Sequence, residues 1–251
     1  MAAYAELAPE AKDALTAGLA ALLARMTDRR ADHLRRTTVD AYEWAYRSLH
    51  LTVTLDAVIR ELASGRPDGR QHDLRDGAMA DTVRWILDRE DRIVLTAHNG
   101  HIQRCPLALP GLPRATTMGM RLAGQLGGDY LVIGTTSATG ATLTTDADGF
   151  AAGEFFVDME EPRPGSLDAL MAASHDGPFA TDLRRLSATD TETLRTISRQ
   201  RFGGLYADVN PLEAFDLVVH LPHVTPAEPD PAALAHAPRE VREAFARWKP
   251  A

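Results

Sequence analysis

The chain has 251 residues, of which 45% are hydrophobic and 25% charged, a composition typical of a globular protein that buries a substantial core. The 35 Asp and Glu residues outnumber the 27 Lys and Arg residues, which argues against nucleic acid as a partner because nucleic-acid binders carry a basic patch. Cys105 is the only cysteine, so no disulfide can form within the chain. No signal peptide or membrane-spanning stretch is evident, and we expect a soluble, cytoplasmic protein without a membrane partner.

Helical patterns fill the first third of the chain. Apolar residues recur at helical spacing over residues 9–26, 39–62 and 76–89, each giving one apolar face. The second pattern stops at the breaker cluster 64–67, Ser-Gly-Arg-Pro. Asp76 is placed to cap the third helix by accepting hydrogen bonds from the amides of its first turn. These patterns predict a helical block over residues 1–68.

The pattern changes after residue 90, where short apolar runs alternate with helical segments. The runs predict buried strands, and their alternation with helices predicts an α/β fold with a mostly parallel sheet flanked by helices. We expect this region to cover residues 69–228, followed by a C-terminal loop and helix over residues 229–251. The predicted strands are 93–95, 130–133, 153–158, 178–183 and 215–221, and the predicted helices are 118–126, 167–173, 190–199 and 238–248.

A long helical block before the first strand is unusual for an α/β domain. Either it is a helical subdomain, or earlier strands of the sheet are missing from this chain. The sequence favours neither explanation, so an incomplete sheet stays open.

The densest polar cluster is Thr96-Ala97-His98-Asn99-Gly100-His101, directly after the predicted strand 93–95. Ligands of open α/β sheets bind beyond the carboxyl ends of the strands, where this loop is expected. His98 and His101 can converge on one point, and histidine suits proton transfer near neutral pH or donation to an oxyanion. The alternative is that both are loop histidines bonded to nearby backbone.

Two weaker candidates accompany the histidines. Arg75 could direct its guanidinium at a carboxylate or carbonyl oxygen, although a solvated Arg75 beside a capping Asp76 explains the pair equally well. His98 and His101 with Asp76 or Glu154 would offer the nitrogen and oxygen ligands that zinc accepts. The sequence has no His-Glu-x-x-His motif and no cysteine pair, and we expect neither a metal nor a cofactor.

Taken together, several segments resemble the erythromycin esterase family, with the same order and spacing over about residues 70–228. The segments that carry the resemblance are 74–80 (LRDGAMA), 93–102 (IVLTAHNGHI), 117–122 (TMGMRL), 128–134 (GDYLVIG), 214–217 (AFDL) and 224–226 (VTP).

The resemblance implies a carboxylic-ester or lactone hydrolase that attacks its small-molecule substrate, such as a macrolactone, with an activated water. It implies that His98 and His101 line the site and that Arg75 binds or polarises the substrate. Asp76 and Asn99 are then expected to orient the helix and the loop.

One family feature is not found in this chain. Family members carry an earlier strand ending in a Gly-Glu-x-x-His motif, whose histidine is taken to be the general base. The upstream histidines here, His33, His50 and His72, follow neither a Gly-Glu pair nor a predicted strand. Three readings stay open: a hydrolase lacking its N-terminal portion, a non-catalytic binding protein, and a half-enzyme completed by another chain. Self-association or a partner chain would cover the missing part of the sheet.

Overall fold

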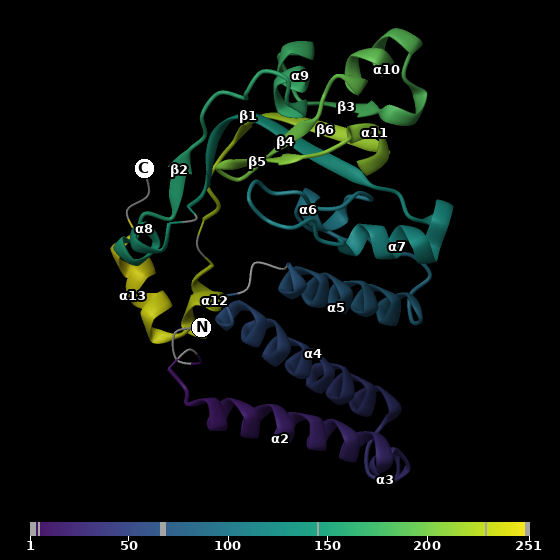
Figure 1. Ribbon diagram of the computed structural model, residues 1–251, viewed down its shortest axis with the longest axis vertical. Helices are drawn as coiled ribbons and strands as arrows, with labels where there is room; N and C mark the ends of the chain where they lie inside the picture. The colour runs from purple at the N-terminus through teal and green to yellow at the C-terminus, as the bar shows by residue number, and fades with distance from the viewer. Residues whose placement is uncertain (1–3, 5, 66–68, 145, 229, 249–251) are drawn as a thin grey trace.

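The N-terminal region of the protein is a stack of helices. The computed structural model describes residues 4, 6–65, 69–144, 146–228 and 230–248. Helix α4 packs between α2 and α5 (Figure 1). None of the helices in these ranges is both long and apolar enough to cross a membrane. The block comprises α2 Pro9–Asp28, α3 Arg30–Leu34, α4 Val39–Ala63 and α5 Arg70–Leu87.

Polar contacts help to hold helix α2 on α4, and none of the described residues of α2 is fully buried. The buried carboxylate of Asp56 on α4 accepts hydrogen bonds from the hydroxyls of Thr16 and Tyr4. Arg60 forms an ion pair with Asp13 at 2.9 Å. Because apolar burial supplies most tertiary stabilisation of helices, we infer that α2 is the more weakly attached member of the stack.

Helix α5 begins earlier than predicted. It starts at Arg70, directly after Gly69, whose φ of 75° is favourable for glycine alone among the common residues. Asp76 therefore lies within the helix, and the prediction that it caps the N-terminus is wrong. The breaker cluster does separate α4 from α5, although its residues 66 and 67 lie outside the described ranges.

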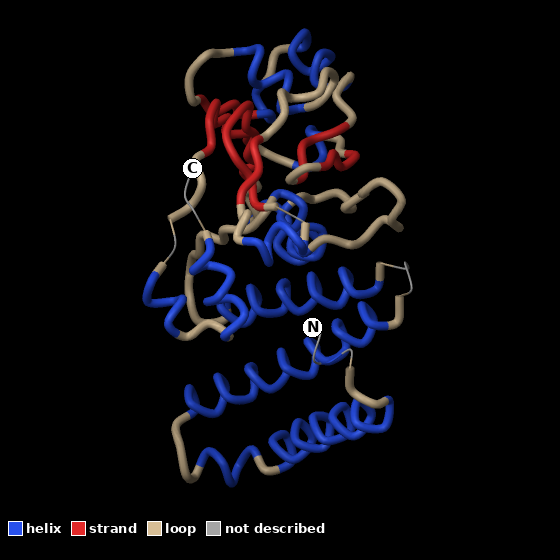
Figure 2. The backbone as a smooth tube through the Cα atoms, turned by 90° about the vertical axis from the view of Figure 1, so that its left-hand side faces the viewer, coloured by secondary structure: helices blue, strands red, loops and turns tan. Residues whose placement is uncertain are grey.

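A mixed four-stranded sheet lies on the other side of α6 and α7 from the helical stack, with strand order β2-β1-β6-β3 (Figures 1 and 2). The central strands β1 and β6 are parallel, whereas β2 and β3 pair antiparallel at the edges. A separate hairpin joins β4 and β5. The strands are β1 Ile133–Leu143, β2 Phe156–Asp158, β3 Phe179–Asp182, β4 Arg199–Phe202, β5 Leu205–Asp208 and β6 Leu217–Val224.

The α/β class with a preceding helical block is confirmed, but the described sheet is mixed rather than mostly parallel. The 11-residue strand β1 spans roughly 36 Å. The six-residue helix α8 that follows it spans only about 9 Å. After this short helical connection, β2 pairs antiparallel with the end of β1.

Helices cover both faces of the sheet, with α9 and α10 on one side and α6 and α7 on the other (Figure 1). The helix predicted at 118–126 is confirmed, and its C-cap is Gly127 as expected. The helices are α6 Asn99–Ile102, α7 Met118–Leu126, α8 Ala147–Ala152, α9 Leu167–Ser174, α10 Ala188–Arg195, α11 Pro211–Ala214, α12 Pro231–Ala235 and α13 Arg239–Arg247, with 3-10 turns η1 Gly127–Asp129 and η2 Leu183–Arg185.

Two apolar clusters form the core. The larger one packs α9, β6 and neighbouring loops around Phe215 and Val218, and the smaller one joins α5 to α7 through Val83 and Met118. Ile102 and Tyr130 pack against both clusters. The loop that carries the histidines is thereby fixed between the helical stack and the sheet.

The predicted strand 93–95 does not form in the described structure. This segment has no strand assignment, and the side chain of Val94 is 93% exposed. A strand needs backbone partners, but the edge of β1 at Thr135 is occupied by the side chain of Asn99. The segment therefore leaves an apolar, β-branched side chain in solvent.

Two other predicted elements have different boundaries in the structure. The strand predicted at 130–133 instead begins at Ile133 and continues to Leu143. The helix predicted at 190–199 ends at Arg195, because Arg199 enters the β4–β5 hairpin.

Helix α7 packs so closely against the histidine loop that position 119 leaves no room for a side chain, which can be tested. A Cβ atom there would lie 2.0 Å from the backbone oxygen of Ile102. Gly119→Ala is therefore expected to lower the free energy of unfolding by about 1–3 kcal/mol or more, measured by urea denaturation. Gly124 on the same helix has no atom within 4 Å of such a Cβ, so Gly124→Ala should instead stabilise by about 1 kcal/mol. Equal effects of the two substitutions would contradict this packing.

Candidate active site

A buried carboxylate joins α5 to α7 and to the short helix α6 of the histidine loop. Asp76 projects from the middle of α5 and is only 4% exposed. One of its oxygens, Oδ2, accepts the backbone amide of Met118 at the start of α7 at 2.8 Å. Both oxygens lie within hydrogen-bond distance of Nδ1 of His101 on α6, at 2.9 and 3.1 Å.

The contact with Asp76 determines which nitrogen of His101 carries the proton. A carboxylate can only accept hydrogen bonds, so Nδ1 of His101 is the protonated nitrogen. Nε2 then presents a lone pair and makes no hydrogen bond to any described residue. An imidazole oriented in this way by a buried carboxylate can remove a proton from a bound reactant.

His98 is held in the opposite tautomer. It is the N-cap of α6, and its Nδ1 accepts the backbone amide of Gly100 at 3.0 Å. The proton of the neutral ring must therefore lie on Nε2. His98 is exposed as a whole, but partial desolvation of its ring lowers its pKa, and the neighbouring His101 lowers it further. A neutral His98 can thus donate a hydrogen bond through Nε2 near neutral pH.

The ring of His98 rests on the β4–β5 hairpin. Its centroid lies 4.3 Å from that of Phe202, in an edge-to-face arrangement. A Cβ atom at Gly100 would come within 2.5 Å of the same phenyl ring, so glycine permits this close approach. Sequence reasoning did not predict the hairpin, although Gly203-Gly204 between two short runs is the kind of signal that marks a two-residue hairpin loop.

Asn99 connects the histidine loop to the sheet. Its Nδ2 donates to the backbone oxygen of Thr135 at 2.7 Å, and its Oδ1 accepts the Thr135 amide at 3.0 Å. Behind it, a buried amide chain continues through Gln200 to Gln103, the two side chains being 2.9 Å apart. Buried and satisfied polar networks rigidify their surroundings, which fits the expectation that Asn99 orients the loop.

The remaining predicted site residue, Arg75, is exposed on α5 next to Asp76. No hydrogen bond or ion pair links it to the histidines within the described residues, so its substrate contact stays a prediction. The zinc alternative gains no support, because the described part of the chain contains no group of three or more His, Cys, Asp or Glu side chains able to hold a metal ion.

A second buried polar pair lies further along the sheet and was not predicted. Nδ1 of His220 on β6 lies 3.0 Å from the hydroxyl of Thr136 on β1. Its Nε2 is buried without a hydrogen-bond partner among the described residues, and burial lowers the pKa of this histidine. A lone histidine in a strand carries no sequence signal that separates it from an ordinary core residue.

Comparison with known proteins assigns this chain to a family. The sequence model described as "Erythromycin esterase" matches residues 1–224, and the chain belongs to this family. The "Erythromycin esterase type II" of Escherichia coli is 30% identical over 226 residues, which are 84% of this chain and 52% of that protein. The match extends the resemblance into the N-terminal helices.

Solved structures show the same fold. A mutant of the erythromycin esterase EreC in its open conformation superposes with a TM-score of 0.70 at 21% identity, over 88% of this chain and 55% of that one. A succinoglycan biosynthesis protein gives a TM-score of 0.67 at 19% identity, over 89% and 53% of the two chains. This chain therefore spans about half the length of the relatives it matches.

The environment of His98 generates a prediction about pH. Its ring protons are expected to titrate below the ordinary value of about 6.5 in an NMR titration, because burial disfavours the charged ring. A histidine with a lowered folded-state pKa contributes stability above its unfolded pKa, and that stability is lost as pH falls. His98→Asn keeps a capping side chain and should lose less stability than the parent between pH 7.5 and 5.5. A His98 pKa at or above 6.5 would contradict the desolvation of this ring.

Proposed function

We propose that this protein is an esterase-type hydrolase that opens an ester or macrolactone by adding water. Family membership and the Asp76–His101 pair support this proposal. In the reaction the water oxygen attacks the carbonyl carbon, the ester C–O bond breaks, and one proton passes from the water to the leaving oxygen.

The two tautomers suit the two demands of this reaction. In this proposal His101 takes the general-base role that the resemblance gives to the histidine of the Gly-Glu-x-x-His motif. Its Nε2 accepts the proton of the attacking water and returns it to the leaving oxygen, while Asp76 stabilises the charged ring between these steps. Nε2–H of His98 donates a hydrogen bond to the carbonyl oxygen as its negative charge develops. Arg75 binds or polarises the substrate from the exposed side of α5, and no cofactor is needed for these steps.

The observation that carries the proposal is the pairing of His101 with the buried Asp76. The test is a mass-spectrometric assay of the purified chain with erythromycin and a panel of small lactones. We expect a mass gain of one water, reduced about 10²–10⁴-fold in His101→Ala and also strongly reduced in His98→Ala. Exposed His236, at the end of α12, provides the control variant His236→Ala. Full turnover in both active-site variants would contradict the catalytic roles proposed for His98 and His101.

The exposed residues Val94 and Leu95 favour a second candidate, a half-enzyme completed by another polypeptide. Val94 is 93% exposed within the unpaired strand-like segment 93–95, and the match covers only 52% of the Escherichia coli relative and 55% of the EreC structure. A strand added along this segment would bury Val94 and supply further catalytic groups.

Complementation separates the two candidates. The portion of the Escherichia coli relative that this chain does not span is produced separately and mixed with this chain. The half-enzyme candidate predicts turnover only in the mixture, together with protection of the amides of residues 93–97 from hydrogen exchange. Turnover by the chain alone at the same rate, without new protection, would rule it out.

A further inference from the structure

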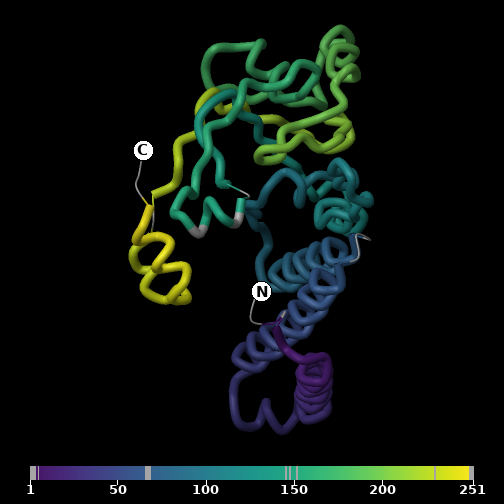
Figure 3. Tube along the Cα trace, turned by 60° about the vertical axis from the view of Figure 1, so that its left-hand side comes forward, coloured from purple at the N-terminus to yellow at the C-terminus, as the bar shows by residue number. Residues whose placement is uncertain are grey.

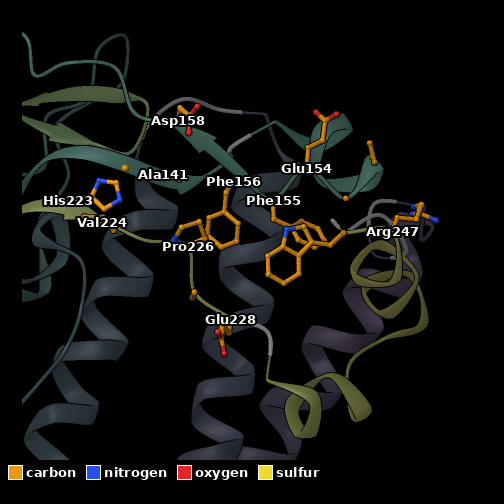
Figure 4. Close-up of a pocket in the computed structure, with 15 residues that line it drawn as sticks. Ala141, Glu154, Phe155, Phe156, Asp158, His223, Val224, Pro226, Glu228 and Arg247 are labelled. Carbon is orange, nitrogen blue, oxygen red and sulfur yellow. The ribbon is translucent and has the colours of Figure 1, made fainter. Parts of the chain in front are cut away.

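A cavity of about 780 Å³ lies away from the histidine loop, at the distal end of the central strands. It is bounded by the end of β1, by β2, by the chain following β6 and by the end of α13 (Figure 4). The C-terminal helices reach this position beside α8, as Figure 3 shows. Its volume falls within the range of small-molecule sites, roughly 300–1,000 Å³.

Aromatic rings form the wall of this distal cavity. Trp248, at the end of α13, has its ring centroid 5.9 Å from those of both Phe155 and Phe156. Phe245 supports the wall from behind, 4.3 Å from Phe155. Figure 4 places Phe155 and Phe156 at the centre of the cavity. Electron-rich ring faces of this kind attract cations.

Carboxylates surround the aromatic wall. Glu154 and Asp158 lie on one side of the rings and Glu228 lies on the other (Figure 4). The basic groups of the lining are Arg247 and His223, and Nδ1 of His223 lies 3.1 Å from the hydroxyl of Thr139.

This distal cavity is separate from the candidate active site. Thr135 holds the histidine loop, whereas Gly140 lines the cavity, and the five residue steps from one to the other along β1 span roughly 16 Å. Trp248, Arg247 and Glu228 also lie beyond the residues 1–224 that match the family. The cavity is thus completed by a C-terminal segment outside the family match.

We propose that the distal cavity binds an organic cation, specifically an alkylammonium group seated on the aromatic wall. The ring faces of Phe156 and Trp248 stabilise the cation, and the three carboxylates raise its local concentration. A neutral ligand of the same shape gains only the apolar contact. The charge-dependent part of the affinity falls with salt, because the carboxylates are exposed.

The test compares choline with its neutral isostere 3,3-dimethylbutan-1-ol, which has the same shape without the charge. Binding is followed by NMR through the indole signal of Trp248 and the backbone signals of Trp248 and Phe156. At low salt we expect choline to bind at least tenfold more tightly than the isostere, with the difference shrinking at 0.5 M salt.

Two variants and a matched control locate the binding. The exposed pair Glu154→Gln and Asp158→Asn, made together, should remove most of the tenfold difference, and Trp248→Leu should weaken both ligands. Glu90→Gln removes an exposed carboxylate elsewhere and should change nothing. Equal affinity for the two ligands, or an equal effect of Glu90→Gln, would overturn the proposal. If Trp248→Leu detaches α13, the double carboxylate variant still tests the proposal, because it changes only exposed side chains.

Discussion

The carboxylate of Asp76 is the contact on which the candidate site depends. It is fixed in α5, it accepts the first amide of α7, and it bonds the imidazole of His101 on α6. Breaking a buried hydrogen bond to a charged group leaves its partners unsatisfied and is costly. The position of the histidine loop and the packing of α5 against α7 are therefore consequences of the same side chain.

The two histidines differ because their surroundings differ. His101 faces a carboxylate and keeps its proton on Nδ1, whereas His98 faces a backbone amide and keeps its proton on Nε2. One ring then offers an acceptor and the other a donor, a division of roles that ester hydrolysis requires. Upstream of the loop, the side chain of Val94 is 93% exposed.

Local sequence patterns predict a large part of the fold, but they do not predict how the candidate site is assembled. Helical periodicity predicted α4 and α7, and the α/β class followed from the alternation of patterns. The start of α5 was misplaced because residues 70–75 contain a single apolar side chain, Leu74, which is too few to show a helical period. Segment 93–95 has the composition of a strand, but strand formation depends on a partner that local sequence does not encode. The pairing of Asp76 with His101 also joins residues 25 positions apart, which no short motif reports.

The most direct test of the account is a long-range ¹H–¹⁵N NMR spectrum of the histidine side chains near pH 7.5, assigned with His98→Asn and His101→Asn. The account predicts His101 protonated on Nδ1 and His98 protonated on Nε2. A spectrum with His101 protonated on Nε2 would show that Asp76 does not orient this ring, and would contradict the proposed division of roles.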